Sequence, residues 1–406
     1  MPPAFTLSDD VRDARSPVVV AARRTPVGTA GRSLAAYDVA ALTAPVLQAL
    51  VADLADLADL ADLAEAAEAP SIDEVLVGNC MGPGGDPARV AALAAGLGVE
   101  VPGVTVDRQC GSGLEAIAQA ATRVRLGGGV VLAGGAESAS TAPTRLALLP
   151  DGRREAYDRA RFAPDEFGDP GMGEAADALA AARGVTRHRQ DAYAARSHAL
   201  AVAAQQSGVY APELVAVGAV TVDERPRQGL DASRLARFRP AFTAGGTATA
   251  GNSCGISDGA AAVAVVDEAT RARWGVPGIA VRAVSAVGVD PRLPGLGPVP
   301  AVETVLDAAG LTLADVDALE LTEAFAAQVL ACTDAWGLDP LGGPGERVVC
   351  TEGGAIALGH PWGASGALLV VRLFSRMVRR DGPRFGVATC AVGGGQGLAV
   401  LVERVG

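Results

Sequence analysis

The apolar residues of this chain form two patterns that alternate along it: uninterrupted runs and residues at helical spacing. Uninterrupted apolar runs at 17–21 and 130–132 predict strands that are buried on both faces. Apolar residues at helical spacing predict helices at 39–50, 188–206 and 301–309. This alternation of strands and helices predicts an α/β protein with a largely parallel sheet.

The stretch 104–125 combines a β-branched run, a turn rich in glycine and serine, and a helix. Cys110 therefore stands where a strand ends and a helix begins. Because the unpaired N–H groups at a helix N-terminus stabilise an anion, we expect a lowered thiol pKa and a nucleophilic Cys110. The alternative is a buried structural cysteine. The apolar residues of the helix share one face: Leu114, Ile117, Ala118, Ala121 and Val124.

A low-complexity run at 52–69 repeats leucine every three residues. A period of three drifts around a helix of 3.6 residues per turn, so these leucines do not form one apolar stripe. We expect a mostly solvated helix there, without a chemical role.

Composition narrows the class of protein. The 406 residues predict two or three domains, and half of the residues are hydrophobic. The formal net charge of −12 comes without a basic stripe, so we expect no nucleic-acid partner. No window approaches the roughly 18 uninterrupted apolar residues of a membrane span, so we expect no membrane association.

The cysteines indicate a reducing compartment. They lie far apart without a CxxC pair, and the first ten residues do not resemble a secretory leader. We therefore expect reduced thiols, a cytoplasmic location and no metal site. The six are Cys80, Cys110, Cys254, Cys332, Cys350 and Cys390.

The segment 138–237 differs from its surroundings, because charge rises and strands become few. We interpret it as an inserted lobe that lies over a site, with His188 and His198 in surface or capping roles. The lobe divides an N-terminal half, made of 1–137 and 238–275, from a C-terminal half at 276–406.

The two halves resemble each other. The turn Cys110-Gly-Ser-Gly opens a helix before a strand that ends in two glycines, and Gly363-Ala-Ser-Gly opens a helix before a strand that ends in three. A duplicated α/β unit would bring the two turns together near a pseudo-twofold axis. This arrangement would place His360 beside Cys110.

Seven segments, in this order, resemble motifs of the thiolase family, and the resemblance covers nearly the whole chain. They are RQCGSGLEAI around Cys110, AGGAESAS at 133–140, LARFRPAF at 235–242, GNSCGISDGAAA at 251–262, LTEAFAAQ at 321–328, GGAIALGHPWGASGA at 353–367 and GGGQG at 393–397.

The resemblance implies a five-layer αβαβα fold with duplicated βαβαβαββ halves, a lobe that binds coenzyme A, and dimers or dimers of dimers. It implies that Cys110 takes an acyl group as a thioester and that His360 accepts the thiol proton. The backbone N–H groups of Cys110 and Gly393 would form an oxyanion hole. Arg227 matches the position that contacts the nucleotide, and Met172 the position that lines the pantetheine tunnel. Coenzyme A thioesters are then substrates, and no separate cofactor is expected.

Four positions depart from the family pattern. The usual ATLCIGGGQG reads ATCAVGGGQG here, so Ala391 takes the place of the second catalytic cysteine and Cys390 comes one residue early. Because neighbouring residues of a strand point to opposite faces, Cys390 should face away from the site unless a bulge turns it back. Thr322 replaces the asparagine that would position a water for the other oxyanion hole, and its hydroxyl can still hold water.

The other two departures concern substrate binding. Gly171 stands where enzymes of the acetoacetyl type often carry a histidine. Cys254 replaces a serine near the pantetheine amide, and a thiol is the weaker hydrogen-bonding partner.

Three hypotheses about function follow. The first is a thiolase-type acyltransferase that forms a cysteine-linked acyl-enzyme from acyl-CoA or β-ketoacyl-CoA, with thiolysis and Claisen condensation as its reactions. The second is a divergent enzyme of specialised metabolism, motivated by Ala391, which passes the acyl group to water, another acceptor or a preactivated nucleophile. The third is a pseudoenzyme that binds acyl-CoA. Intact motifs around Cys110 and His360 argue against the third.

Overall fold

The computed structural model describes residues 4–8, 10–60 and 71–406. Its strands are β1 (Phe5–Thr6), β2 (Pro17–Arg24), β3 (Gly28–Thr29), β4 (Ile72–Gly78), β5 (Gly103–Val106), β6 (Val130–Ser138), β7 (Arg145–Leu148), β8 (Arg154–Tyr157), β9 (Ser257–Asp267), β10 (Gly278–Gly288), β11 (Ala318–Leu321), β12 (Phe385–Val392) and β13 (Gln396–Val405). Its α-helices are α1 (Val39–Leu60), α2 (Pro87–Ala94), α3 (Ser112–Arg125), α4 (Met172–Arg183), α5 (Arg187–Gln206), α6 (Ala232–Leu235), α7 (Glu268–Trp274), α8 (Pro298–Ala309), α9 (Ala326–Ala335), α10 (Ala355–Leu358) and α11 (Trp362–Phe374).

One sheet runs through the molecule in the order β11-β12-β13-β10-β2-β9-β6-β4-β5. In the N-terminal part, β4 pairs with β6 in parallel, and β9 pairs antiparallel with both β6 and β2. The C-terminal part repeats this pattern, because β11 pairs with β12 in parallel and β13 pairs antiparallel with both β12 and β10. Strands β10 and β2 join the two parts in an antiparallel pairing. The two halves of the chain therefore share one topology. Most pairings of the described sheet are antiparallel, so the prediction of a largely parallel sheet is wrong.

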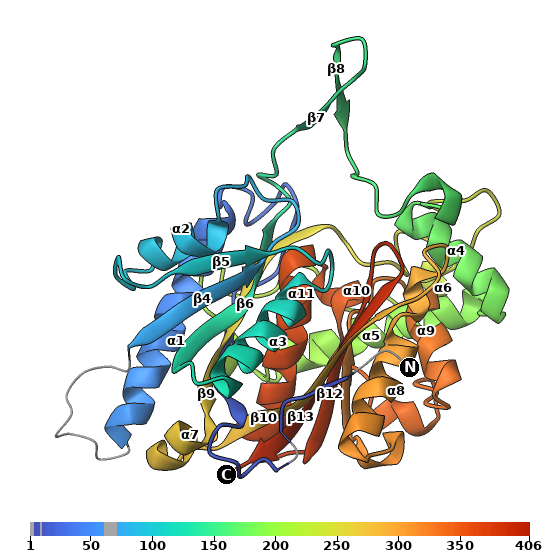
Figure 1. The fold of residues 1–406 in the computed structure, drawn as a ribbon. Coiled ribbons are helices and arrows are strands. Elements are labelled where there is room, and N and C mark those ends of the chain that lie inside the picture. The colour runs from blue at the N-terminus through green and yellow to red at the C-terminus, as the bar shows by residue number, and fades with distance from the viewer. Residues whose placement is uncertain (1–3, 9, 61–70) are drawn as a thin grey trace.

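Figure 1 shows helices on both sides of the strands and between them, and three apolar cores lie between these layers. The central core contains α3 and α11 together with residues from both parts of the sheet. A second core lies between the N-terminal strands and the helices α1, α2 and α7, and a third between the C-terminal strands and the helices α8 and α9. The order of helices and strands is therefore αβαβα, as the resemblance predicted. The fifth strand of the C-terminal half is reduced to one parallel bridge, between Leu319 and Val349.

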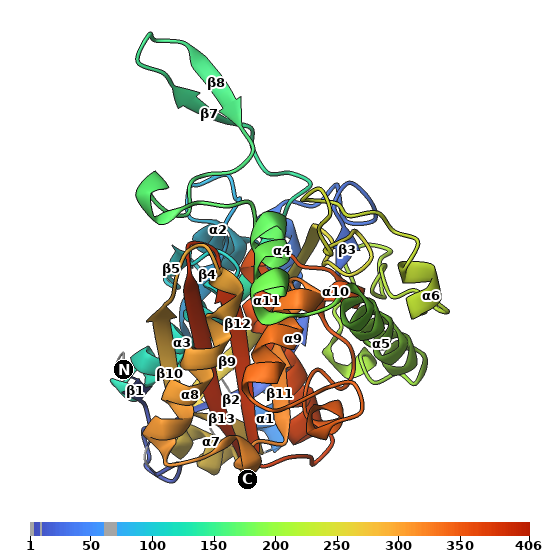
Figure 2. The same cartoon turned by 90° about the vertical axis from the view of Figure 1, so that its right-hand side faces the viewer.

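The segment predicted as an inserted lobe supplies α4, α5, α6 and a hairpin made of β7 and β8. The hairpin projects far from the body of the molecule, as Figure 2 shows. The outer face of this hairpin carries the exposed side chains of Leu146 and Leu148.

Helix α1 continues well beyond the predicted end at residue 50. Within α1, Val39–Ala58 is long and apolar enough to cross a membrane by length and composition alone. Its residues from Val39 to Leu54 pack in the N-terminal core against the sheet, so we interpret α1 as a core helix. The prediction of a mostly solvated helix from residue 52 is wrong at Leu54, which is buried, while 61–69 lie outside the described residues.

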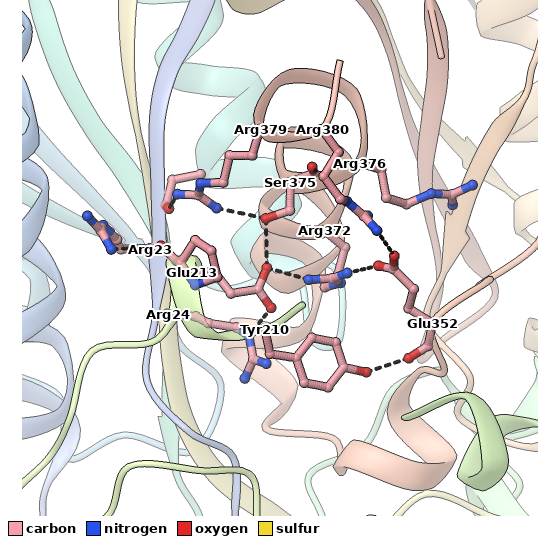
Figure 3. Close-up of polar contacts among 12 residues, drawn as sticks. Arg23, Arg24, Tyr210, Glu213, Glu352, Arg372, Ser375, Arg376, Arg379 and Arg380 are labelled. Atoms are coloured by element: carbon pink, nitrogen blue, oxygen red, sulfur yellow. Dashed lines mark hydrogen bonds and ion pairs between the residues drawn. The ribbon is translucent and has the colours of Figure 1, made fainter. Parts of the chain in front are cut away.

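A buried network of charges connects the lobe to both halves of the chain (Figure 3). We call it the arginine network. Glu213 of the lobe accepts hydrogen bonds from Arg24 in β2 and Arg372 in α11. The ring of Tyr210 lies between the two guanidinium groups, 5.0 Å from Arg24 Cζ and 4.7 Å from Arg372 Cζ. The full set is Arg24, Tyr210, Glu213, Asp223, Glu352, Arg372 and Ser375.

Candidate active site

Cys110 lies in a tight turn between β5 and α3. The residue before it, Gln109, has a φ of 48°, in the left-handed region that residues other than glycine rarely adopt. The residue after it, Gly111, is the N-cap of α3. The turn therefore holds the cysteine at the N-terminal end of the helix, where sequence analysis placed it.

The electrostatic environment of Cys110 differs from the predicted one. Burial raises the pKa of this thiol, and the neighbouring thiols of Cys254 and Cys390 raise it further. The prediction of a lowered pKa is therefore wrong for the free protein, because loss of water outweighs the helix N-terminus. Cys110 needs a base to become a thiolate.

His360 offers an unused base. Its ring is 2% exposed, and its Nδ1 lies 2.5 Å from the Oγ of Ser365. Ser365 donates its own proton to the carbonyl oxygen of Pro361 at 3.0 Å, so its oxygen accepts the proton of Nδ1. This arrangement leaves the lone pair on Nε2, which is buried without a hydrogen-bonding partner in the described part of the chain. Burial lowers the pKa of His360 to about 4, so the ring is neutral near pH 7.

Close packing of α3 against α11 brings the two helix N-termini together. A Cβ added to Gly113 would lie 2.7 Å from the carbonyl oxygen of Gly363 and 3.0 Å from the N of Ala367. A Cβ on Gly366 would lie 2.6 Å from the N of Leu114. Glycine is therefore required at these crossings. Cys110 and His360 lie three residues before Gly113 and Gly363, so the crossing places both at one end of the central layer.

Glu137, which sequence analysis did not single out, fixes this crossing. One carboxylate oxygen accepts the N–H of Gly363 at 3.0 Å and the N–H of Cys80 at 3.2 Å. The other oxygen accepts the side-chain amide of Asn79 at 3.0 Å. Burial raises the pKa of Glu137, which is fully enclosed. A carboxylate at the end of a buried strand, in the segment GGAES, could have indicated its role from the sequence.

Thr322 follows β11 and is 2% exposed. Its hydroxyl donates to the sulfur of Cys390 at 3.4 Å. Two of the departures from the family pattern therefore contact each other. A hydroxyl whose proton is used in this way presents only lone pairs to a further partner.

The strand that carries Cys390 and Ala391 is regular. β12 pairs with β13 from Phe385 to Val392 without a shift in register, so no bulge turns a side chain round. Cys390 is fully buried in the central core, and Ala391, on the opposite face, is partly exposed. Burial raises the pKa of Cys390 to about 12.

Gly393 lies in the turn between β12 and β13, under the ring of Phe162 from the lobe. A Cβ added to Gly393 would lie 2.8 Å from the Cδ2 of Phe162. A cavity of about 510 Å³ opens beside this turn and is lined by Gln109, Phe162 and Gly393 among others. The turns of Cys110 and Gly393 therefore border the same space.

Cys254 lies on a loop beside the segment of Thr322, because its N–H donates to the carbonyl oxygen of Ala324 at 3.0 Å. The next residue, Gly255, accepts the N–H of His360 at 2.9 Å. Burial raises the pKa of Cys254 to about 12, although the charge of Arg225 opposes this. Cys254 therefore belongs to the same cluster as Cys110.

The remaining predicted binding residues belong to the lobe. Met172 begins α4, after its N-cap Gly171, and is partly exposed. Arg227 has an exposed side chain, and its backbone N–H donates to Nδ1 of His198 at 3.3 Å. Of the predicted surface or capping roles, the surface role is wrong for His198, which is 4% exposed, whereas its acceptance of a backbone N–H is compatible with capping. The burial of His198 depends on the segment around Arg227, which is distant in sequence.

Two family descriptions cover most of the chain. "Thiolase, N-terminal domain" matches residues 17–269, and "Thiolase, C-terminal domain" matches residues 277–404. The chain belongs to the thiolase family. The predicted resemblance is confirmed.

Curated relatives of this thiolase carry the name acetyl-CoA acetyltransferase. The protein of Escherichia coli (strain K12) is 40% identical over 408 residues, which cover 96% of this chain and 99% of the relative. The protein of Pseudomonas aeruginosa is 38% identical over 406 residues, which cover 95% and 99%. The crystal structure of the Bacillus anthracis acetyl-CoA acetyltransferase matches with a TM-score of 0.84 at 35% identity, over 96% of this chain and 99% of that one.

This thiolase is therefore an acyltransferase of the thiolase type, and acyl-CoA thioesters are its substrates. The first hypothesis about function is confirmed at this level. The comparisons give no support to the divergent enzyme or to the pseudoenzyme over it. The described residues contain no group of three or more His, Cys, Asp or Glu side chains that could hold a metal ion.

Proposed function

We propose that this thiolase transfers acyl groups through a thioester on Cys110, with Nε2 of His360 as the base that accepts the thiol proton. The observation that carries this proposal is the buried Nε2, which has no hydrogen-bonding partner among the described residues, on a ring whose Nδ1 is held by Ser365. A neutral imidazole is a suitable base for a thiol whose pKa is raised.

The acylation step follows from these roles. The sulfur of Cys110 attacks the carbonyl carbon of the thioester, and its proton passes to His360. The bond between that carbon and the sulfur of coenzyme A breaks, and the departing thiolate takes the proton from His360. The backbone N–H groups of Cys110 and Gly393 stabilise the oxyanion, and each such donor is worth roughly 3–4 kcal/mol.

Thr322 and Cys390 act together on the other oxyanion hole in this proposal. Because the Thr322 hydroxyl donates its proton to Cys390, its oxygen lone pairs are left to accept a hydrogen bond from a water. That water has a second O–H, which can donate to the thioester oxygen. In this proposal Thr322 accepts a hydrogen bond from the water, as the asparagine of the family pattern would.

The carbon–carbon half of the reaction lacks a thiol at position 391. Thiolysis and Claisen condensation both require a proton transfer at the α-carbon of the acetyl group. The side chain on the partly exposed face of β12 is Ala391, and Cys390 is enclosed in the core. We propose that this half of the reaction is slower than acylation. The expected rate factor is roughly 10²- to 10⁴-fold, the contribution of one proton-transfer group.

Coenzyme A thioesters are the only small molecules in this proposal, and no separate cofactor takes part. The names of the relatives support acetyl-CoA as one of the two thioesters. Arg227, Met172 and Cys254 bind coenzyme A, at the nucleotide, the pantetheine arm and the amide next to the thioester respectively. Their places on the lobe and on the loop beside His360 are consistent with these roles.

We also propose a homo-oligomer, either a dimer or a dimer of dimers. Strand β5 lies at the edge of the sheet, where its unpaired side can accept another strand. The projecting hairpin exposes Leu146 by 53% and Leu148 by 73%, which suits a contact with another subunit. A cytoplasmic location is consistent with the six free cysteines.

An exchange assay tests the acyl-enzyme without the carbon–carbon step. Acetyl-CoA is mixed with 3′-dephospho-CoA, and transfer of the acetyl group between the two is followed by chromatography. We expect transfer that is lost in Cys110→Ala and retained in Arg273→Gln, a change on the exposed side of α7. Absence of transfer at high enzyme concentration would contradict the proposal.

A further inference from the structure

Arg225 is a half-buried cation without an anionic partner in the described part of the chain. Its Nε is buried and makes no hydrogen bond. Its Nη1 makes one long hydrogen bond, 3.5 Å from the Oγ1 of Thr29. By contrast Arg24, which is fully buried, contacts two carboxylates. Removing a guanidinium from water without a counter-charge costs free energy, so an anion from outside the chain would be stabilised at Arg225.

The guanidinium of Arg225 lies against the loops that carry the reacting residues. It packs on the Cα of Gly255, where an added Cβ would overlap it. Its Cδ lies 3.0 Å from the place of a Cβ on Gly359, the residue before His360. Gly255 follows Cys254, and its carbonyl oxygen accepts the N–H of His360 at 2.9 Å. Glycine at both positions leaves room for this side chain.

The residues before Arg225 anchor it to the body of the protein. The carboxylate of Asp223 accepts hydrogen bonds from both Nη atoms of Arg24, at 2.7 and 2.8 Å, and from the N–H of Val27 at 2.9 Å. Glu224 accepts the Oγ of Ser33 at 2.6 Å. Both carboxylates next to Arg225 in the sequence therefore bind other groups, and within the described residues neither forms an ion pair with its guanidinium, although the charge of Glu224 still acts on it.

The position of Arg225 indicates which part of the substrate it meets. The phosphates of coenzyme A are separated from its sulfur by the whole pantetheine arm, and Arg227 lies on the exposed side of the same segment. Arg225 lies instead beside the neighbours of Cys254 and His360. Burial raises the pKa of the Cys254 thiol and the charge of Arg225 opposes this rise, which is consistent with a guanidinium close to Cys254. An anion that binds Arg225 would therefore be part of the acyl group of the substrate and not of the nucleotide.

We propose that Arg225 binds a carboxylate at the far end of the acyl group, so that this thiolase prefers the acyl groups of dicarboxylic acids, such as succinyl and glutaryl. A planar guanidinium matches a carboxylate and can donate two parallel hydrogen bonds to it. The inference rests on the proposed acyl-enzyme. The chemistry is unchanged: the bond from the acyl carbon to the sulfur of coenzyme A is exchanged for a bond to the sulfur of Cys110, and the carboxylate stays ionised.

The exchange assay with 3′-dephospho-CoA tests this preference in the unmodified protein. Succinyl-CoA and glutaryl-CoA are compared with butyryl-CoA and pentanoyl-CoA, which have similar length and no carboxylate. We expect kcat/KM to be roughly 10- to 100-fold higher for the anionic pair. Acyl-pantetheines, which lack phosphates, should keep the same ratio, since the recognised group lies in the acyl chain.

Variants separate the role of the side chain from effects on folding. Arg225→Gln should reduce the ratio between anionic and neutral donors to about one, Arg225→Lys should retain part of it, and Arg273→Gln should leave it unchanged. An equal ratio in the unmodified protein, or a loss in Arg225→Gln that is the same for all CoA donors and absent with acyl-pantetheines, would overturn the inference and leave the acyl-enzyme intact. Absence of exchange from every donor would instead overturn the proposed function, and the inference with it.

Discussion

The arginine network and the catalytic pocket are both buried and polar, and they differ in how many of their polar atoms have partners. In the network, Glu213 contacts Arg24, Arg372 and Ser375 (Figure 3). Burial alone would raise the pKa of Glu213, but the charges of Arg372 and Arg24 outweigh it and the pKa is lowered. Every charge there has an opposite charge in contact.

The pocket has the opposite character. Among the residues that the structure describes, the base nitrogen of His360 has no hydrogen-bonding partner and Arg225 makes no ion pair with a carboxylate. The thiol of Cys110 has a pKa that burial raises. A satisfied network stabilises one arrangement of the chain, whereas unsatisfied groups keep their bonding capacity for a substrate. Burial by itself therefore does not indicate a functional site, whereas buried polar groups without hydrogen-bonding or ionic partners do.

Replacing the base should give the largest effect on activity. His360→Asn removes the acceptor for the thiol proton, so we expect kcat of acetyl exchange to fall by roughly 10²–10⁴. The free energy of unfolding, measured with urea at pH 7.5, should change by less than about 1 kcal/mol, because Nε2 has no hydrogen bond within the described residues and the amide of asparagine can donate to Ser365 in place of Nδ1. A large loss of stability together with retained exchange would show that His360 stabilises the fold and is not the base, so that the pocket would not differ from the arginine network.

Breaking the network should have the reverse effect. Glu213→Ala leaves the buried guanidinium groups of Arg24 and Arg372 short of an anion, so we expect a loss of roughly 3–5 kcal/mol in the free energy of unfolding. Acetyl exchange per folded molecule should stay within about twofold, a range that urea titration and exchange on the same sample can establish. Glu346→Ala, on an exposed carboxylate outside the network, is the matched control. Equal stability of the two variants would show that the network contributes little.

Adding a thiol to the pocket should accelerate the carbon–carbon step without a matching change in acetyl exchange. Ala391→Cys restores a proton-transfer group on the partly exposed face of β12, so we expect thiolysis of acetoacetyl-CoA to accelerate by roughly 10². Acetyl exchange, which needs no proton transfer at carbon, should change little. The ratio of the two rates is the measurement, and Ala388→Cys, in the buried core, serves as control. An equal gain in both reactions would point to a general change in the pocket.

The pH dependence of stability should give the smallest effect. Burial lowers the pKa of His360 to about 4, from an ordinary value of 6.5, so the unfolded chain binds more protons between these values. Stability from this group is therefore full above pH 6.5 and is lost as the pH falls toward 4. Between pH 7.5 and 5.5, the unmodified protein should lose about 1 kcal/mol more than His360→Asn in urea titrations. An identical loss in both would show that the ring is not buried in its neutral form.

Much of the fold follows from local sequence patterns. The apolar periods predicted the helices of the central and outer layers, and the repeated glycine turns predicted the shared topology of the halves. The position of Cys110 at a helix N-terminus could also be predicted, because it depends only on neighbouring residues. The extension of α1 past residue 50 could not, since the burial of Leu54 depends on the sheet that it meets.

The electrostatics of the site depend on contacts between distant segments. Burial raises the pKa of Cys110, and Cys254 and Cys390, which lie far away in the sequence, raise it further. The contact of Thr322 with Cys390, and the unpaired state of Arg225, likewise appear only when the loops are assembled. Sequence patterns thus predicted which residue types meet, and the fold determines their protonation and partners.

Mass spectrometry of the protein after brief mixing with acetyl-CoA and acid quenching can detect the proposed thioester on Cys110. The account predicts an added acetyl group that peptide mapping places on Cys110, with accumulation that slows strongly in His360→Asn and is absent in Cys110→Ala. An acetyl group on another residue, or equal accumulation in His360→Asn, would contradict it.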